Sequence, residues 1–230
     1  MKLNFLTLKR TPIFEQLQLE EALLRTNQEN WCIINTDVPP SIVLGVSAKP
    51  HLVINPEIFH LRPIPVVRRF SGGGTVYVDE NTLFVTFIFN YPSFPQKVLD
   101  WSEEFYRPIF SSIPFQLREN DYTVGEKKFG GNAQYFRKER FLHHTSFLFD
   151  YQESNMNYLL YPPKTPQYRQ GRSHQDFLTK LTHHFESKEA VIDRISNELA
   201  THYKISNCTY QEAQSFLQIA HRKTTTLIEL

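Results

Sequence analysis

The residues best suited to chemistry in this chain gather around its glycines, of which there are only eight in 230 residues. Residues 68–74 read Arg-Arg-Phe-Ser-Gly-Gly-Gly and lie between two short apolar runs. Adjacent glycines let backbone N–H groups converge without obstruction by Cβ atoms, which is how a nest for an anionic oxygen forms. A nearby arginine can bind phosphate or carboxylate through two parallel hydrogen bonds. Residues 71–74, called the glycine loop below, therefore predict a binding site for a phosphate or carboxylate.

The glycine loop fits neither of two common nucleotide-binding patterns. A Walker loop requires Gly-Lys-Ser/Thr followed by a helix, whereas a predicted strand follows the glycines here. A dinucleotide-binding fingerprint requires the spacing Gly-x-Gly-x-x-Gly, which this segment does not have. The simplest alternative is a tight hairpin flanked by surface arginines, although the preceding Arg-Arg-x-Ser favours a binding site.

A second glycine cluster follows two lysines, with Lys127 and Lys128 just before Gly130 and Gly131. We expect a Gly-Gly turn here, from which a lysine could reach an anion bound by the glycine loop. The alternative is an ordinary hairpin turn with two solvated lysines. On an extended strand or hairpin, adjacent lysines point to opposite faces, so that only one of them can reach such an anion.

Two adjacent histidines, His143 and His144, lie in a predicted strand. Because neighbouring strand residues point to opposite faces, at most one of them can face a site, and the pair has poor geometry for a metal ion. We expect a histidine that is hydrogen-bonded within the sheet instead.

The two cysteines, Cys32 and Cys208, have no activating base near them in the sequence. A thiol nucleophile is therefore disfavoured. Two cysteines are too few for a disulfide framework or a structural zinc site, and they suit a reducing cytosol.

Composition and charge disfavour several function classes. Hydrophobic residues make up 40% of the chain, which supports a folded core, and 25 Lys and Arg nearly balance 24 Asp and Glu. A net charge of +1 disfavours binding to duplex DNA or to an anionic membrane. The longest apolar runs, such as residues 83–89, are much shorter than the ~20 residues that a membrane span requires. The first residues lack a secretory signal pattern, so we expect a cytoplasmic protein with no nucleic-acid or membrane partner.

Hydrophobic periodicity predicts the elements that must position these residues. Helices are expected at 13–25, 96–110, 173–185, 188–203 and 209–221, with Thr209-x-x-Glu212 as a capping box for the last one. Strands are expected at 31–35, 42–46, 65–67, 75–78, 83–89, 113–117, 122–124, 133–136 and 140–151. This order predicts an α+β fold, with one mixed, mainly antiparallel sheet and helices on one face. No composition break divides the chain, so we expect a single domain over 1–230, with a helical C-terminal segment at 173–230 and no accessory domain.

In combination, these segments resemble the catalytic domain of the lipoate–protein ligase family, which is related to biotin ligases and octanoyltransferases. The family pattern is Arg-Arg-x-Ser-Gly-Gly-Gly-x-Val, then a nearby Asp, then Lys-x-x-Gly-x-Ala, then His-His. Here these motifs are residues 68–76, Asp79, residues 128–134 and residues 143–144. Residues 14–24 resemble the first helix of the family, so the resemblance covers most of residues 13–150 in the right order.

The resemblance implies a role for each matched residue. Lys128 is the expected catalytic residue, as a fixed cation that contacts the α-phosphate and the acyl carbonyl. The residues expected to bind the nucleotide or the acyl-adenylate are Arg69, Ser71, Gly72, Gly73, Gly74, Thr75, Val76, Tyr77, Asp121 and Lys128. The expected supporting residues are Asp79, Asn132, His143 and His144. No set of metal ligands is matched, and Asp121 is the one candidate for holding Mg²⁺.

The chain also departs from the family pattern. Val78 stands where the family usually has His, residues 81–82 read Asn-Thr rather than Gly-Asn, and Glu119 stands where Arg is common. Residues 168–174 resemble the stretch near the end of the family's catalytic domain. The chain is too short for the additional C-terminal domain of longer ligases, so we expect a compact, divergent member.

The implied reaction has two steps, with ATP, Mg²⁺ and lipoate or a similar acyl acid. The acyl carboxylate attacks the α-phosphorus of ATP, and a lysine of an acceptor protein then attacks the resulting acyl-adenylate. The expected acceptors are lipoyl domains of the 2-oxoacid dehydrogenase or glycine-cleavage type. Two alternatives remain open: a lipoyl or octanoyl transferase that uses a preformed acyl donor, and a non-catalytic module that binds the lipoyl group or adenylate.

Overall fold

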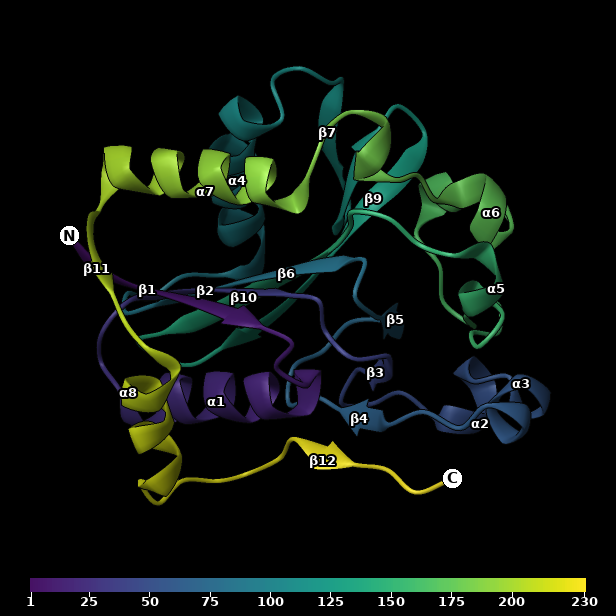
Figure 1. Ribbon diagram of the computed structural model, residues 1–230, viewed down its shortest axis with the longest axis horizontal. Coiled ribbons are helices and arrows are strands. Elements are labelled where there is room, and N and C mark those ends of the chain that lie inside the picture. Colours follow the sequence, from purple (N-terminus) through teal and green to yellow (C-terminus); the bar gives the residue numbers. More distant parts are fainter.

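The computed structural model describes residues 1–230 and has an α+β fold with two sheets (Figure 1). The larger sheet has eight strands in the order β11-β1-β2-β6-β10-β9-β8-β7. Its β1 pairs in parallel with β11 and β2, and the remaining pairs are antiparallel, as the sequence predicted for the sheet as a whole. The strands are Lys2–Lys9 (β1), Trp31–Thr36 (β2), Thr82–Phe89 (β6), Phe115–Arg118 (β7), Asp121–Val124 (β8), Lys127–Phe136 (β9), Phe141–Leu148 (β10) and Lys204–Asn207 (β11).

A second sheet of four strands, where the sequence predicted a single sheet, holds both ends of the glycine loop. Its strands are Ser41–Leu44 (β3), Val66–Arg68 (β4), Val76–Val78 (β5) and Thr226–Leu227 (β12), in the order β12-β4-β3-β5. The loop connects β4 to β5, and β3 pairs with both of these strands. Because one strand fixes the chain on both sides of the loop, the backbone of the loop is held at both ends.

The helices are shorter and more numerous than the sequence predicted. The α-helices are Ile13–Thr26 (α1), Pro50–Val53 (α2), Pro56–Leu61 (α3), Pro95–Ile109 (α4), Glu153–Met156 (α5), His174–Phe177 (α6), Lys188–His202 (α7) and Tyr210–Gln214 (α8). The 3₁₀ turns are Gln167–Arg169 (η1), Leu181–His183 (η2) and Ser215–Gln218 (η3). The predictions for α1, α4 and α7 are confirmed to within one residue at each end.

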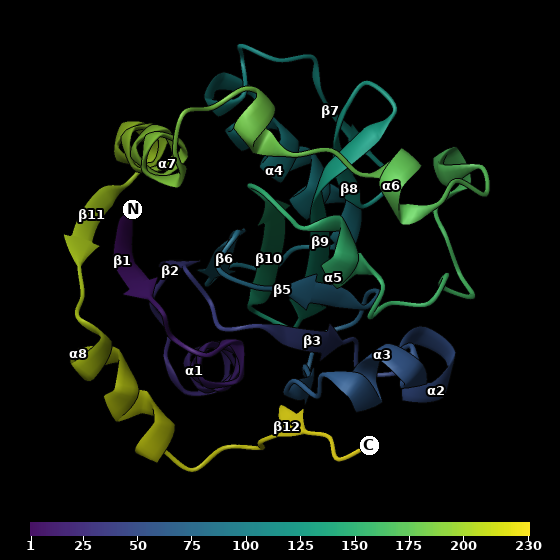
Figure 2. The ribbon, with the colours of Figure 1, turned by 45° about the vertical axis from the view of Figure 1, so that its right-hand side comes forward.

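Helices cover both faces of the larger sheet, whereas the sequence analysis predicted one covered face (Figures 1 and 2). The helices α4 and α7 lie on one face, and α1 and α8 lie on the other. The reason is visible in β6, which is buried along its whole length. Phe87 packs on Phe105 of α4, with ring centroids 5.3 Å apart, whereas its neighbour Ile88 packs with Leu23 of α1. A strand with apolar side chains on both faces of the sheet must be covered by other elements on both faces.

The C-terminal segment is less helical than predicted. Of the three helices expected there, only α7 forms as one piece, while the other two become a short helix followed by a 3₁₀ turn. The predicted capping box is confirmed, because Glu212 N donates to Thr209 Oγ1 at 3.2 Å and Thr209 N donates to Glu212 Oε2 at 2.7 Å. The segment also contributes β11 and β12, which were not predicted.

The Gly-Gly turn predicted near residue 130 is wrong. Gly130 and Gly131 lie inside β9, and the turn between β8 and β9 is at Gly125 and Glu126, where Gly125 has a φ of +57°. A Cβ atom on Gly130 would lie 3.0 Å from ring atoms of both Tyr122 and Phe147. This glycine therefore makes room for aromatic packing across the sheet rather than for a turn.

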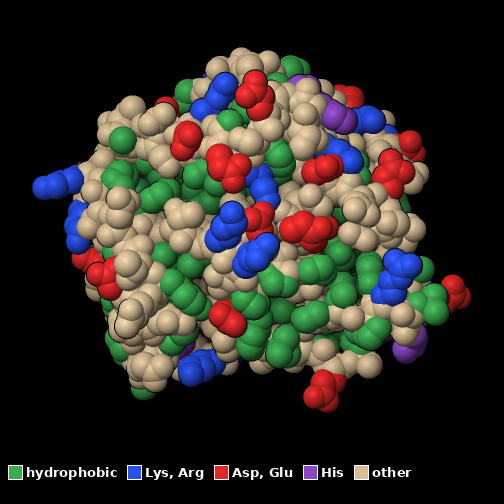
Figure 3. All heavy atoms as spheres, in the orientation of Figure 1, with side chains coloured by type: hydrophobic (Ala, Val, Ile, Leu, Met, Phe, Trp, Pro, Cys, Tyr) green, Lys and Arg blue, Asp and Glu red, His purple; other side chains and the backbone are tan.

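The face drawn in Figure 3 carries side chains of both charges side by side. Hydrophobic side chains gather in the lower right of that view, where Figure 1 shows α2, α3 and β12. Leu52, Leu61 and Leu227 are the exposed apolar residues of these elements. None of the helices combines the length and the apolar character needed to cross a membrane.

Candidate active site

Arg69 holds the glycine loop by hydrogen bonds to the loop's own backbone. Its Nε and Nη2 donate to the carbonyl of Gly72 at 3.0 and 2.6 Å, and Nη2 also donates to the carbonyl of Gly74 at 2.8 Å. Burial lowers the pKa of Arg69 to about 10, which leaves the guanidinium charged at neutral pH. The Nε and Nη2 donors of Arg69 are therefore occupied by the loop carbonyls, and the side chain shapes the loop. The sequence analysis had instead predicted a direct contact between Arg69 and the nucleotide.

The outer part of the glycine loop is open. Gly73 and Gly74 are exposed, and no atom lies within 4 Å of the position that a Cβ would take on Gly72 or Gly74. Gly73 has a φ of +91°, which side-chain-bearing residues rarely adopt. An exposed run of glycine backbone in this conformation is what an anion-binding nest requires.

A buried chain of polar groups connects the loop to the sheet and to α1. Ser71 Oγ lies 3.1 Å from Nε2 of His144, and Nδ1 of the same ring lies 3.0 Å from Oε2 of Glu20. The other oxygen of Glu20 accepts hydrogen bonds from Thr86 at 2.6 Å and from Gln16 at 2.7 Å. Ser71 is fully buried, so its hydroxyl fixes the loop and is closed to attack on a substrate.

Glu20 was missed as a functional residue in the sequence. The available signal was its place on the apolar face of the first helix, three residues after Leu17 and four before Leu24. A carboxylate at such a position has to find buried partners. Here the partners are His144, Thr86 and Gln16.

Lys128 crosses over Gly131 and pairs with Asp121 of the neighbouring strand. Its Nζ lies 2.8 Å from Oδ1 of Asp121, and a Cβ on Gly131 would lie 2.8 Å from the same Nζ. The Lys128 side chain is 22% exposed, whereas its neighbour Lys127 on the same strand belongs to the exposed residues. The two lysines thus differ in surroundings, as their alternation along a strand predicted.

The glycine loop and the Lys128 ammonium lie on one face of β9. A Cβ on Gly73 would be 3.2 Å from Cβ of Ala133, and the ammonium lies over Gly131, two residues earlier on the same strand. Residues two apart on a strand share a face. The structure therefore brings together the glycine loop, Lys128 and Asp121, which come from three separate parts of the sequence.

Two predicted supporting residues, Asn132 and His143, point to the opposite face of the sheet. Asn132 Oδ1 accepts a hydrogen bond from Thr145 at 2.5 Å, and His143 Nδ1 lies 3.3 Å from Nε2 of Gln134. Burial lowers the pKa of His143 to about 3, so its ring is neutral. The expectation of a sheet histidine is met, but neither side chain reaches the face that carries Lys128.

Three residues predicted to bind the nucleotide or to support the site, Thr75, Tyr77 and Asp79, follow the glycine loop, and Tyr77 and Asp79 contact other parts of the protein. Tyr77 stacks on Tyr158 with ring centroids 5.5 Å apart, and Asp79 Oδ1 accepts from the backbone of Asn81 at 2.9 Å in the turn before β6. Burial raises the pKa of Asp79. The hydroxyl of Thr75 is buried without a hydrogen-bond partner.

Val76 and Val78 pack in an apolar cluster with residues of α1 and β3. Val78, which stands where the family usually has His, is fully buried in this cluster. Its side chain is therefore a core residue in this chain.

The side chains near Lys128 do not form a metal site of their own. No three His, Cys, Asp or Glu side chains come close enough together to hold a metal ion. Asp121 is a single carboxylate with Lys128 on one oxygen and the hydroxyl of Tyr168 on the other, at 2.8 and 2.9 Å. A single carboxylate whose two oxygens are already paired does not fit a Mg²⁺ ion held by protein ligands.

Tyr168 is the second residue near the site that the sequence analysis did not single out. It lies in η1, 47 residues from Asp121 in sequence, and burial and the negative charge of Asp121 raise its pKa. The hydroxyl therefore stays protonated and donates to the carboxylate.

Neither cysteine lies among these residues. Cys32 is buried in the apolar core of β2, and burial raises the pKa of its thiol. Cys208 lies near Asn4, with its Sγ 3.7 Å from the Asn4 side-chain oxygen. The expectation that neither cysteine has an activating base agrees with these surroundings.

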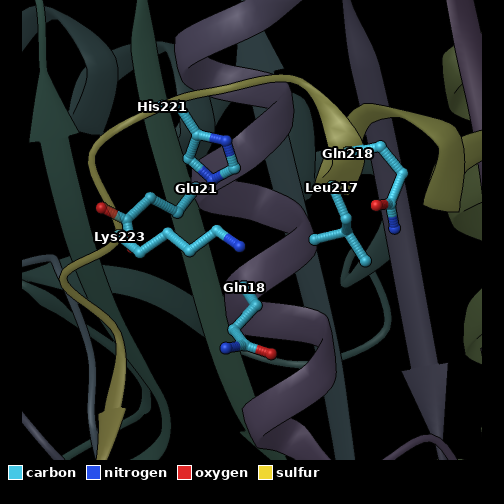
Figure 4. Close-up of a pocket in the computed structure, with 6 residues that line it drawn as sticks. All are labelled: Gln18, Glu21, Leu217, Gln218, His221 and Lys223. Carbon is cyan, nitrogen blue, oxygen red and sulfur yellow. The ribbon is translucent and has the colours of Figure 1, made fainter.

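A separate hollow of about 190 Å³ lies between α1 and the C-terminal segment (Figure 4). It is lined by Gln18, Glu21, Leu217, Gln218, His221 and Lys223. The Glu21 carboxylate accepts from the backbone N–H groups of Thr224 and Thr225 at 2.9 Å each, so it is already used to attach the C-terminal segment. None of the predicted site residues lines this hollow.

The sequence matches the family described as Lipoyl protein ligase A/B catalytic domain over residues 12–204. A relative from Plasmodium falciparum named inactive lipoate–protein ligase 2 is 29% identical, over 78% of this chain and 63% of the relative. The chain thus spans less than two thirds of the length of that relative.

Two solved structures have the same fold. The bi-partite lipoate protein ligase from Thermoplasma acidophilum has a TM-score of 0.79 and 19% identity, over 95% of this chain and 91% of that one. A lipoate-protein ligase A bound with ATP also has a TM-score of 0.79 and 19% identity, over 95% of this chain and 93% of that one. These likenesses confirm the predicted fold, and the family match over most of the sequence establishes that the chain belongs to the lipoyl protein ligase A/B catalytic-domain family.

Proposed function

We propose that this chain activates lipoate, or a similar acyl acid, with ATP and transfers the acyl group to a lysine of an acceptor protein. One observation carries the proposal: the Lys128 ammonium and the open glycine loop lie on one face of β9. A fixed cation beside free backbone N–H groups suits a reaction in which negative charge develops on phosphate oxygens.

In the first step, an oxygen of the acyl carboxylate attacks the α-phosphorus of ATP, and the bond to the β-phosphate oxygen breaks. The products are the acyl-adenylate and pyrophosphate. Both reactants are anionic, so the protein must hold them together against their repulsion. Lys128 would lie between the α-phosphate and the acyl carbonyl, and the glycine loop would donate N–H groups to the phosphate oxygens. Arg69 would act by keeping the loop carbonyls of Gly72 and Gly74 turned inward.

In the second step, the amine of an acceptor lysine attacks the acyl carbon, an amide forms, and AMP leaves. Lys128 would stabilise the negative oxygen of the tetrahedral intermediate as a charge, without forming a covalent bond. Cys32 lies on β2, three strands away from the β9 strand of Lys128, and Cys208 lies beside Asn4 of β1, which favours direct transfer from the adenylate over an acyl-enzyme.

The substrates in this proposal follow from the family and from its named relatives. ATP is supported by the ATP-bound structure with the same fold, and lipoate by the names of the matched ligases. The proposed acceptor is a lipoyl domain of the 2-oxoacid dehydrogenase or glycine-cleavage type, and the E2 lipoyl domain named with the Thermoplasma acidophilum ligase supports a lipoyl domain as acceptor. Mg²⁺ would arrive with the phosphates of ATP, because Mg²⁺ at such sites is held largely by phosphate oxygens and water. We further propose that residues 1–230 act as one domain, in the cytoplasm.

Two alternatives draw support from particular observations. The relative from Plasmodium falciparum is named inactive, and Val78 is a core residue where the family usually has His. Both observations suit a transferase that takes a preformed acyl donor, or a module that binds lipoyl-adenylate without turnover.

The test is to incubate the chain with lipoate, an acceptor lipoyl domain and ATP labelled at the α-phosphate. Labelled adenylate and a lipoylated acceptor support the ligase. If ATP gives no adenylate but added lipoyl-adenylate is transferred, the chain is a transferase. If neither reaction occurs while lipoyl-adenylate binds, the chain is a binding module.

A further inference from the structure

Residues 167–179, called the strap below, attach to the β8–β9 hairpin that carries Asp121 and Lys128. At one end, the N–H of Gln167 donates at 2.7 Å to Oε1 of Glu119, which lies in the β7–β8 turn, two residues before β8 begins. At the other end, the N–H of Thr179 donates to the carbonyl of Lys128 at 2.9 Å. The strap is thus fixed on both sides of the hairpin that positions the candidate catalytic lysine.

The strap is also held in the middle by an arginine. Arg172 Nη1 donates to the carbonyl of Glu126 in the hairpin turn at 2.8 Å, and Nη2 donates to the carbonyl of Tyr168 at 2.7 Å. The ring of Tyr168 contacts the ring of Phe177, with centroids 5.2 Å apart, and the guanidinium of Arg118 lies 5.8 Å from its centroid. These contacts leave the Tyr168 ring one well-defined position, from which its hydroxyl points at the hairpin.

The Tyr168 hydroxyl completes a line of three groups that ends at the ammonium. It donates to Oδ2 of Asp121 at 2.9 Å, and Oδ1 of the same carboxylate lies 2.8 Å from Nζ of Lys128. A carboxylate with a donor on only one oxygen is free to rotate about its last torsion, which is soft. A second donor on the other oxygen fixes the plane of the carboxylate, and with it the direction in which Lys128 is held.

We propose that Tyr168 is a positioning residue of the Lys128 site: by holding Asp121, it keeps the ammonium over Gly131 and aimed along the face of the glycine loop. The expected effect of Tyr168 on the reaction rate rests on the proposed function. The hydrogen bond from Tyr168 to Asp121 does not depend on that function. Tyr168 touches no substrate in this account and acts only through Asp121.

The first test measures the chemical reactivity of Lys128 and needs no enzymatic turnover. An amine-reactive reagent is applied at limiting dose, and the labelling of Lys128 relative to the neighbouring Lys127 is measured by peptide mass spectrometry. The matched control is Tyr161→Phe, because Tyr161 is 49% exposed and its hydroxyl makes no hydrogen bond to the hairpin. We expect Tyr168→Phe to raise the Lys128 to Lys127 ratio by up to about tenfold, because the Asp121 carboxylate can then turn away from the ammonium, and Tyr161→Phe to leave it unchanged. An unchanged ratio in folded Tyr168→Phe overturns the inference, whether or not the chain proves to be a ligase.

The second test uses a double-mutant cycle on single-turnover acyl-adenylate formation. Tyr168→Phe should lower the rate about tenfold with little change in KM for lipoate, and should cost less than about twofold when Asp121→Asn is already present. Equal losses in the two backgrounds contradict action through Asp121. If the wild-type chain forms no adenylate, the proposed function fails, while the labelling experiment still decides the role of Tyr168.

Discussion

The Nζ atom of Lys128 lies over the backbone of Gly131, only 2.8 Å from where a Cβ atom of that residue would be. The lysine side chain can therefore reach Asp121 only because residue 131 has no side chain. The preceding Gly130 has a different neighbourhood, since its missing Cβ would meet the rings of Tyr122 and Phe147 on the other face. Two adjacent glycines thus serve two different purposes, one at the candidate site and one in the core.

This difference predicts opposite phenotypes for two adjacent substitutions. Gly131→Ala should displace the flexible end of Lys128 and lower acyl-adenylate formation about 10²-fold, with little change in the free energy of unfolding. Gly130→Ala should lower the free energy of unfolding by about 1–3 kcal/mol, because buried rings must move. Single-turnover kinetics and urea unfolding of both variants provide the comparison. If Gly131→Ala is fully active, Lys128 does not act from the position described.

The two adjacent lysines should differ strongly in importance. Lys128→Ala removes the ammonium on the loop face and should lower adenylate formation by about 10²–10³, as for removal of one group that stabilises an oxyanion. Lys127→Ala removes a solvated charge and should change the rate by less than about fivefold, equivalent to less than ~1 kcal/mol. Circular dichroism serves as the control for folding. Equal losses would mean that the lysines act only through their general charge.

The cysteines should be dispensable. A variant with Cys32→Ala and Cys208→Ser should keep acyl transfer within about twofold, although the buried Cys32→Ala change should cost about 1–2 kcal/mol of unfolding free energy. The measurement is transfer of lipoate to an acceptor domain by the purified variant. A double variant that folds normally yet transfers nothing would bring back a thiol mechanism.

His143 should make the fold sensitive to acid. Burial lowers the pKa of His143 to about 3 in the folded chain, against 6.5 for a free histidine. Between these pH values the unfolded chain binds a proton that the folded chain does not, so the free energy of unfolding falls as the pH falls. The slope from this residue approaches about 1.4 kcal/mol per pH unit.

The acid sensitivity can be isolated with His143→Gln, which cannot titrate. Between pH 6.5 and pH 5 the wild-type chain should lose about 1.6 kcal/mol more unfolding free energy than this variant. Urea unfolding at the two pH values gives both numbers. Parallel losses in the two proteins would show that folding does not lower the pKa of His143.

Much of the fold and the site could be predicted because the signals are local. The glycine loop and the Lys-x-x-Gly-x-Ala motif are each contiguous in sequence, so both could be recognised from the sequence, although only the glycine loop forms the turn that was predicted for it. The helices α1, α4 and α7 were found from periodicity because each buries one apolar side.

What the sequence analysis missed depends on partners that are distant along the chain. Glycines 130 and 131 suggested a turn, but their role is set by residues on the two neighbouring strands and by the lysine. His144 and Glu20 are 124 residues apart, and Tyr168 and Asp121 are 47 apart, so no local pattern indicates either contact. The strand β1 was not predicted, and its register is set by β2 and by β11, which lies almost 200 residues later in the chain.

The central claim is that the face shared by the glycine loop and Lys128 forms an acyl-adenylate from ATP. The most direct measurement is single-turnover conversion of ATP labelled at the α-phosphate in the presence of lipoate, with wild-type chain and Lys128→Ala side by side. We expect labelled lipoyl-adenylate with the wild-type chain and a rate about 10²–10³ times lower with Lys128→Ala. A wild-type chain that folds, binds ATP and lipoate, and still forms no adenylate would contradict this claim.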